Sequence, residues 1–286
     1  MVRAMLIQVL NGVVYGGLLY LLAVGLVLIF GLREIVNFAH GALFMLGSYI
    51  GFSIAAIFDF WLGLAGAIVA MTLVGLCLDA GVLRPLRKHD HMVTVLVTFG
   101  ILLVLETFAT AVWGKAFRSM QPPELLSGTV ELFGEPFPVY RLFVIAVSLC
   151  VAGGLTVWLR HSRIGLYVRA SSVDPTTTGI LGVDTDRLSL LVVGLGTGLA
   201  GMSGVIAAPL MALSPTMGNF ILIESFIVVV VGGLGSFSGA FIAALLIGQI
   251  HNMGAVYLPW ASTLLPFLLM VCVLIWRPTG IAGGKG

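Results

Sequence analysis

Long runs of apolar residues, separated by short polar segments, dominate the sequence. Charged residues are absent between Arg3 and Arg33, between Arg141 and Arg160, and between Arg187 and Glu224. A helix needs about 20 apolar residues to cross a bilayer, and these runs are continuous, whereas barrel strands alternate. The pattern predicts an all-α, polytopic membrane protein with a single domain over residues 1–286. We expect about eight hydrophobic segments, at 7–30, 36–57, 61–83, 92–113, 141–159, 188–212, 221–250 and 261–276.

The composition agrees with this class. Of 286 residues, 59% are hydrophobic and 9% are charged, and the mean hydropathy is +1.14. Soluble domains carry about 25% charged residues, so this chain cannot cover a water-facing surface. The net charge of +2 at pH 7 is too small to favour nucleic-acid binding. A lipid bilayer is therefore the expected environment.

Lys and Arg residues gather in a few short segments, which predicts the orientation. Nine of the fourteen lie in three segments: 84–88, 160–187 and the tail that holds Arg277 and Lys285. Short basic loops stay in the cytoplasm, so we expect these segments and the C-terminus there. The loop 114–141, where acidic and basic residues balance, is expected outside. The side of the N-terminus stays open.

The segment 221–250 does not fit a single crossing. Three hydrophobic segments follow the basic loop that ends at Arg187, and an odd number cannot return the tail to the cytoplasm. The centre of the segment contains many glycines, each of which costs a helix about 1 kcal/mol. We therefore expect two half-helices, a re-entrant pair that meets at a break at membrane depth. A second glycine-flanked break is expected at 31–41, around Glu34.

Polar residues inside the apolar segments are candidates for a transport pathway. Such residues face either a cavity or a partner helix, and the sequence leaves both interpretations open. Gly232, Gly233 and Gly235 are expected to adopt non-helical dihedral angles, with Ser236 and Ser238 satisfying the freed backbone groups. His40 has no neighbour at metal-ligand spacing, so no metal is expected. The candidates are Asn37, His40, Glu106, Glu224, Gly232, Gly233, Gly235, Ser236 and Ser238.

Two other motifs resemble functional signatures, but the sequence around them supports these functions less well. A G-x-G-x-x-G pattern at 196–201 resembles a dinucleotide fingerprint, but it lies inside an uncharged run and fits close helix packing better. Ser203 and His251 resemble the motifs of rhomboid intramembrane proteases; otherwise they are a packed serine and a histidine at a membrane edge. The sequence has no G-x-x-x-x-G-K-[ST] phosphate loop, so no cofactor or nucleotide is expected on this chain.

Four motifs in order closely resemble those of bacterial branched-chain amino-acid ABC transporter permeases of the LivH type. The resemblance runs from about residue 8 to 282, and its motifs are GLREIVNFAHGALFMLGSY (31–49), SRIGLYVRA (162–170) leading to GILGVDTDRL (179–188), VVGGLGSFSGAFIAALLIG (230–248) and RPTGI (277–281). It implies the type II importer fold in a bacterial inner membrane. The implied partners are a homologous second permease, two cytoplasmic ATPase subunits and a periplasmic substrate-binding protein.

The resemblance also implies the function. The chain would import branched-chain or related amino acids through a largely apolar pathway at the interface with the second permease, and other chains would hydrolyse the ATP. The solute would pass without being held tightly. The alternative is a secondary transporter that works without ATPase subunits. The acidic loop residues Glu124, Glu131 and Glu135 either help to dock the binding protein or simply form a solvated loop.

The segment 160–187 has the signals of a short helix that couples the permease to its ATPase. Asp174 and Pro175 are typical of an N-cap and a first helical residue, and Gly182 of a left-handed stop. Two turns are too short to be stable alone, and Thr176–Thr178 depart from the family pattern and weaken the helix further. We therefore expect it to insert into an ATPase groove; the alternative is an ordinary basic loop held at anionic lipid. The predicted coupling residues are Arg163, Gly165, Arg169, Ala170, Asp174, Pro175, Gly179, Ile180, Leu181 and Gly182.

Overall fold

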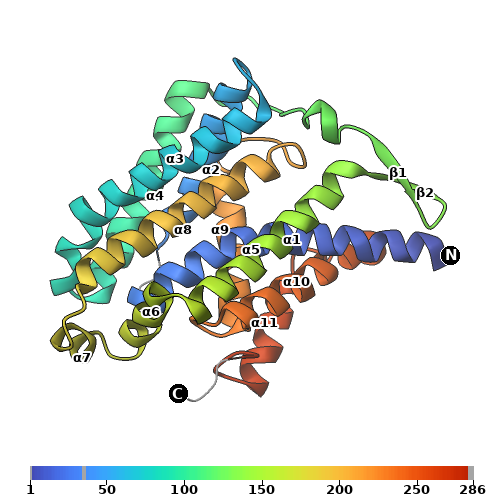
Figure 1. Cartoon of the computed structure of the whole chain (residues 1–286). Helices are drawn as coiled ribbons and strands as arrows, with labels where there is room; N and C mark the ends of the chain where they lie inside the picture. Colours follow the sequence, from blue (N-terminus) through green and yellow to red (C-terminus); the bar gives the residue numbers. More distant parts are fainter. Residues whose placement is uncertain (1, 34–36, 283–286) are drawn as a thin grey trace.

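The computed structural model describes residues 2–33 and 37–282. Glu34, in the first expected break, lies outside the described residues. Within them the chain forms eleven α-helices and one antiparallel hairpin (Figure 1). The elements are α1 (Val2–Arg33), α2 (Ala39–Ala55), α3 (Phe60–Leu78), α4 (His91–Trp113), β1 (Thr129–Leu132), β2 (Glu135–Pro138), α5 (Val139–His161), α6 (Arg163–Val173), α7 (Pro175–Ile180), α8 (Thr185–Ala207), α9 (Met217–Gly232), α10 (Phe237–Tyr257) and α11 (Leu265–Trp276).

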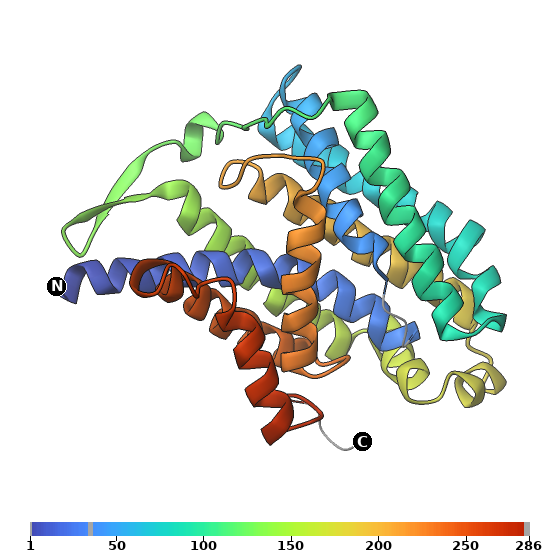
Figure 2. The same cartoon turned by 180° about the vertical axis from the view of Figure 1, so that it is seen from behind.

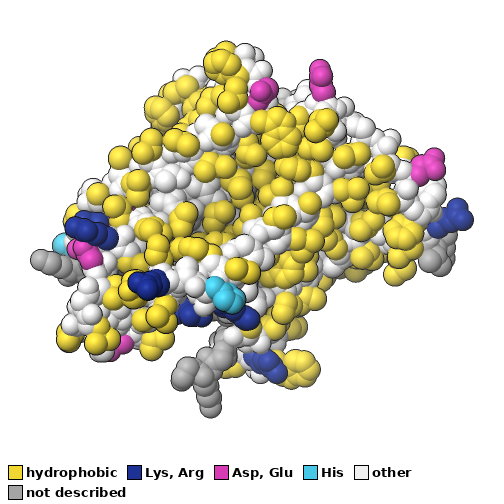
Figure 3. All heavy atoms as spheres, in the orientation of Figure 1, with side chains coloured by type: hydrophobic (Ala, Val, Ile, Leu, Met, Phe, Trp, Pro, Cys, Tyr) yellow, Lys and Arg dark blue, Asp and Glu magenta, His cyan; other side chains and the backbone are white. Residues whose placement is uncertain are grey.

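The long helices run up and down between two ends of the molecule. The N-terminus and the β1–β2 hairpin lie at one end, which we call the hairpin end (Figures 1 and 2). Helices α6 and α7 lie at the other, which we call the arginine end because its segments carry Arg84, Arg160, Arg163, Arg169, Arg187 and Arg277. Between the ends, apolar side chains cover most of the visible surface (Figure 3). Six helices are long and apolar enough to cross a membrane, and α2, α9 and α11 are shorter apolar helices.

Helices α1 and α8 form the centre of the bundle. In their most apolar stretches, 78% and 72% of the residues are buried, against 17–39% in the other long apolar helices. Glycines allow this close packing: a Cβ added at Gly47 of α2 would lie 2.5 Å from the Cα of Gly201, and one at Gly25 of α1 would lie 2.5 Å from the carbonyl oxygen of Gly196. The G-x-G-x-x-G pattern is thus a helix-packing surface, as expected.

The predicted break is confirmed, and it changes the helix count. The segment 221–250 is divided between α9, which runs to the arginine end, and α10, which returns to the hairpin end. From α8 onward there are therefore four apolar helices, and an even number returns the tail to the arginine end. The expected count of about eight segments becomes nine apolar helices among the described residues, because one segment contains two.

The dihedral angles at the break agree only in part with the prediction. Gly233 and Gly235 have φ values of +100° and +79°, a region that favours glycine. Gly232 is the last residue of α9 and is needed for close approach, since a Cβ there would lie 2.5 Å from the backbone nitrogen of Ala240. Ser236 accepts a hydrogen bond from the backbone N–H of Gly239 at 3.1 Å and so caps α10.

The tail covers the end of α9. The N–H groups of Ile281 and Ala282 donate to the carbonyl oxygens of Val231 and Gly232 at 2.8 and 3.1 Å. A helix leaves its last carbonyls without partners, so the tail satisfies groups that the break exposes. The two motifs at 230–248 and 277–281, which are far apart in the sequence, form one structural unit.

The depth of the break differs from the expectation of a re-entrant pair at membrane depth. Gly235 and Ser238 line a cavity together with Arg160 and Arg169, which places the break at the arginine end. The physical reason is helix length. Helix α10 has 21 residues and α9 has 16, so each runs most of the way between the two ends, whereas half-helices would meet in the middle.

Candidate functional site

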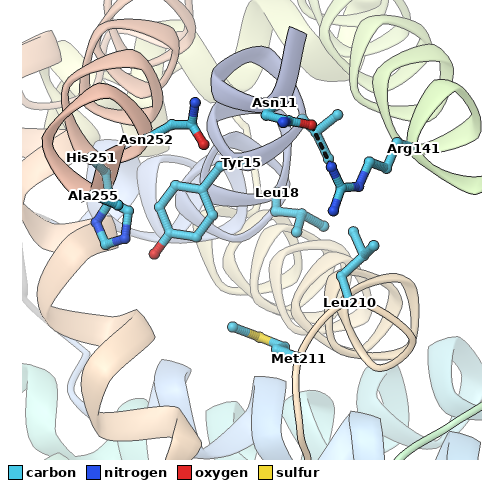
Figure 4. Close-up of a pocket in the computed structure, with 10 residues that line it drawn as sticks. Asn11, Tyr15, Leu18, Arg141, Leu210, Met211, His251, Asn252 and Ala255 are labelled. Atoms are coloured by element: carbon cyan, nitrogen blue, oxygen red, sulfur yellow. Dashed lines mark hydrogen bonds between the residues drawn. The ribbon is translucent and has the colours of Figure 1, made fainter. Parts of the chain in front are cut away.

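A cavity of about 310 Å³ opens between α1, α5 and α10 in the half of the molecule nearer the hairpin end. Part of its wall is apolar, and several uncharged polar groups and one arginine point into it (Figure 4). We call it the outer cavity. Its apolar lining comes from Val14, Leu18, Leu210 and Met211, and its polar lining from Asn11, Tyr15, Arg141, His251 and Asn252.

One wall of the outer cavity contains Tyr15 and His251, whose side chains both contact the carboxylate of Glu224. The Tyr15 hydroxyl donates a short hydrogen bond to the Glu224 carboxylate. The His251 ring stacks on Tyr15 with centroids 4.5 Å apart, and its Nδ1 lies 3.5 Å from Glu224 Oε1. Glu224 is 20% exposed and lies behind the two rings, so it gives this wall a negative charge.

The opposite wall is positively charged. Arg141, near the start of α5, donates a short hydrogen bond to Asn11 Oδ1, which the dashed line in Figure 4 marks, and its guanidinium lies 6.0 Å from the centre of the Phe137 ring. On α10, next to His251, Asn252 donates hydrogen bonds to the backbone oxygen and the side chain of Gln8, at 2.7 and 3.1 Å. The cavity thus has a cation on one wall and, on the facing wall, two rings that contact a carboxylate, with apolar side chains between the walls.

The other polar candidates in the first half of the chain take part in helix packing. The Glu106 carboxylate accepts a hydrogen bond from Asn219 at 3.2 Å, which links α4 to α9. His40 is fully buried, with Nε2 3.2 Å from the carbonyl oxygen of Leu22 in α1. Asn37 is 3% exposed and accepts a hydrogen bond from the N–H of Ala39 at the start of α2. Glu106 and His40 therefore join helices, and Asn37 binds the backbone at the start of α2.

The residues of the break contribute to a second cavity, of about 220 Å³, at the arginine end. Gly235 and Ser238 line it together with Gly31, Arg160 and Arg169. The predicted pathway residues are therefore not brought together at one place. Glu224 lies at the outer cavity, and the glycine-rich break lies at the opposite end of α9 and α10.

The protease motif is not assembled in this arrangement. The buried Ser203 hydroxyl donates to the carbonyl oxygen of Ala200 at 2.8 Å, and the His251 ring lies against Tyr15 and Glu224. Catalysis by a serine and a histidine requires a hydrogen bond between them, and each of these side chains has other partners.

The short helix predicted in the basic loop is present as α7, and its start and stop agree with the prediction. Asp174 accepts hydrogen bonds from the N–H groups of Thr176 and Thr177 at 3.0 and 2.9 Å, and Pro175 is the first helical residue. The helix ends at Ile180, and Gly182 has a φ of +88°.

The threonines stabilise this helix, contrary to the weakening that we expected. The Thr177 hydroxyl donates to the Asp174 carboxylate at 2.5 Å, and the Thr178 hydroxyl donates to the Asp174 carbonyl oxygen at 2.7 Å. These hydroxyls engage the cap, an effect that helix propensity alone does not include. The hydrogen bonds from Thr177 hold the pKa of Asp174 below its usual range, so Asp174 is ionised at neutral pH.

Helices α6 and α7 present apolar side chains at the arginine end. Val173, Ile180 and Leu181 are 87%, 81% and 78% exposed. Large apolar residues exposed beside arginines indicate a surface that another molecule covers. Leu181 also lines a cavity of about 600 Å³ between α6, α7 and α8, whose lining includes Arg187. We call α6 and α7 together the coupling surface.

The coupling surface is fixed to the bundle at both of its ends. Ser162 caps α6 by accepting a hydrogen bond from Gly165, where a side chain would meet the backbone of Leu159. Asp184 caps α8 by accepting from the N–H groups of Asp186 and Arg187, and the hydrogen bond from Arg187 holds the pKa of Asp184 below its usual range. These caps define the boundaries between α5 and α6 and between α7 and α8.

The residues that sequence reasoning missed are Asn11, Tyr15, Arg141 and Asn252, while His251 was considered only as part of a protease motif. Tyr15 and Asn11 are isolated polar residues in a long apolar run, which is the only signal that the sequence offers. Their common location depends on the contact between α1 and α10, which are 236 residues apart at Tyr15 and His251.

Comparison with a solved structure supports the fold. The chain aligns with a chain of PsaBC from Streptococcus pneumoniae in complex with Fab, with a TM-score of 0.50 and 11% identity over 94% of this chain and 91% of that one. At this identity the likeness concerns the fold alone.

Comparison of sequences identifies the family. The chain is 30% identical to the high-affinity branched-chain amino acid transport system permease protein LivH of Escherichia coli, over 96% of this chain and 94% of that protein. It is 29% identical to the corresponding protein BraD of Pseudomonas aeruginosa, over 96% and 95%. The family model described as branched-chain amino acid transport system, permease component, matches residues 8–274. The chain therefore belongs to the family of permease components of branched-chain amino acid transport systems.

Proposed function

We propose that the chain is a membrane-spanning subunit of an ATP-driven importer and that it translocates branched-chain or related amino acids. The names of the relatives, which match along almost the whole chain, support this substrate class. The chain itself would form part of the pathway and perform no chemistry on the solute. ATP would be hydrolysed on separate cytoplasmic subunits.

The distribution of basic residues supports one orientation in the bilayer. The arginine end would face the cytoplasm, in accordance with the rule that short cytoplasmic loops are rich in Lys and Arg. The hairpin end, and with it the N-terminus, would then face outward. Nine crossings from an outer N-terminus lead to a cytoplasmic C-terminal tail, so this assignment is consistent with the helix count.

The observation that carries the coupling role is the exposed apolar surface of α6 and α7. A short, capped helix that exposes Ile180 and Leu181 among arginines needs a protein partner to bury these side chains. A groove of an ATPase subunit would fit this surface. The outward Glu124, Glu131 and Glu135 are exposed and remain available for docking a binding protein.

The test is transport by the assembled complex, which would contain this chain, a homologous second permease and two ATPase subunits. In proteoliposomes with the binding protein, we expect uptake of labelled L-leucine that requires ATP. A variant with Ile180→Asp and Leu181→Asp should lose ATPase subunits on purification, and a control with Val130→Asp at the hairpin end should keep them. Uptake of leucine without any ATPase subunit would instead support a secondary transporter and overturn the proposal.

A further inference from the structure

We propose that the outer cavity is a weak binding site for a zwitterionic amino acid with an aliphatic side chain, through which the solute passes on its way inward. The inference rests on the proposed function, and it assigns the solute to a place and to named residues. Three features carry it: a cation on one wall, two polar rings on the facing wall that contact a carboxylate, and apolar side chains between them.

Arg141 is suited to hold the carboxylate of the solute. A guanidinium has five N–H donors, and the hydrogen bond that the structure gives Arg141 uses one nitrogen, toward Asn11 Oδ1. Among the described residues the guanidinium has no second hydrogen-bond acceptor, which leaves donors for a carboxylate; guanidinium binds a carboxylate in a two-pronged geometry. Asn11 and the Phe137 ring hold the arginine side chain in place, so that the guanidinium is already positioned when the solute arrives.

The wall around Tyr15 is suited to hold the ammonium group. The Tyr15 hydroxyl donates a hydrogen bond to Glu224, and its oxygen can still accept a hydrogen bond from the solute. The negative charge of Glu224 behind it attracts a cation. Arg141 and Glu224 form no ion pair with each other in the described part of the chain. Glu224 contacts Tyr15 and His251, so its charge acts on the solute through this wall and not by direct contact.

The size and the apolar lining favour an aliphatic amino acid. A volume of about 310 Å³ lies at the lower end of the range of ligand pockets, about 300–1,000 Å³, so the solute must be small. Leu18 and Met211 offer apolar surface between the charged walls (Figure 4). An analogue that lacks either charge would leave one wall without a partner and would bind more weakly.

Saturation-transfer NMR measures such weak binding directly. The sample is the assembled complex in lipid nanodiscs without the binding protein and without nucleotide, and the probe is L-leucine. We expect a leucine signal that Arg141→Gln weakens by about tenfold or more, because a charge-assisted hydrogen-bonded pair is lost. Arg118→Gln is the matched control, since Arg118 lies at the same end but outside the cavity lining, and it should leave the signal unchanged.

Two further comparisons separate binding in this cavity from a structural effect. Leucinamide, which lacks the carboxylate, should give a weak signal that Arg141→Gln does not reduce further. Met211→Trp, which fills the cavity and keeps both charges, should also abolish the leucine signal. Equal leucine signals from the wild-type complex and the Arg141→Gln variant would overturn the inference, as would an Arg141→Gln variant that weakens leucine and leucinamide alike.

The result can be told apart from failure of the proposed function. If the wild-type complex imports leucine with ATP but the outer cavity variants bind and transport it normally, the site is wrong and the function stands. If the complex imports no amino acid at all, the proposed function fails, whatever the NMR experiment shows.

Discussion

At the scale of single residues, the glycines of the break have two distinct structural roles. Gly233 and Gly235 hold positive φ angles, whereas Gly232 permits close contact between α9 and α10. At Gly235 the nearest atom to an added Cβ is the Cα of Gly31 at 3.7 Å, so there is room for a side chain. A substitution at Gly235 therefore tests backbone conformation alone.

We expect Gly235→Val to impair transport more than assembly, because a β-branched residue at φ +79° costs on the order of 1–3 kcal/mol. Gly235→Asn should be milder, since Asn tolerates this region. The measurement is leucine uptake alongside the thermal stability of the purified complex. Gly153→Val, on an open face of α5, is the control and should behave like the wild type. Normal uptake by Gly235→Val would mean that the conformation of the break does not matter for transport.

At the scale of the secondary-structure elements, α7 depends on its cap. The helix has six residues, so it cannot be stable by its own hydrogen bonds. Asp174 and the threonine hydroxyls hold its first turn. The lowered pKa of Asp174 means that this contribution is present above the ordinary range of the carboxyl, near 3.8, and is lost as the pH falls through the depressed pKa of the folded state.

We expect Asp174→Ala to uncouple ATP hydrolysis from uptake, because the first turn of α7 loses its acceptor. Asp174→Asn keeps a capping oxygen, and Asn caps helices as well as Asp does. The asparagine variant should therefore retain most of the coupling. The ratio of ATP hydrolysed to leucine imported, measured at pH 7.5, compares the two. Equal ratios for the alanine variant and the wild type would mean that the Asp174 cap is not needed for coupling.

At the scale of the whole molecule, the two ends of the bundle differ in charge. Six arginines lie at the end of α6 and α7, whereas Arg3, Arg118 and Arg141 lie at the hairpin end together with Glu124, Glu131 and Glu135. We propose from this difference that the arginine end faces the cytoplasm. In that orientation the solute would meet the outer cavity first.

We expect a membrane-impermeant maleimide to label Arg3→Cys and Phe117→Cys in intact cells, and Val173→Cys only after the membrane is opened. All three positions are exposed. Cys77, Cys150 and Cys272 are also exposed on helices, so they must first be replaced by Ala. The variant without cysteines is the control for background labelling. Labelling of Val173→Cys in intact cells would reverse the orientation and move the coupling surface outside.

Much of the fold could be predicted from local pattern. The apolar runs located the long helices, because the cost of an unpaired backbone group in lipid permits only helices there. The glycine-rich stretch after Val231 predicted a break, and Asp174 with Pro175 predicted a helix start to the residue. These features depend on neighbours in the sequence, where spacing and residue type carry enough information.

What the sequence determined by itself was the class of protein, the positions of most helices and the short capped helix of the basic loop. The tertiary structure alone decided the depth of the break, because that depends on the direction in which α9 and α10 run. It also decided that Tyr15 and Arg141 line one cavity with Glu224 in contact with Tyr15, while His40 and Glu106 join helices. A polar residue in an apolar helix has the same local pattern in either case; only the packing of distant helices determines whether it faces a cavity or another helix.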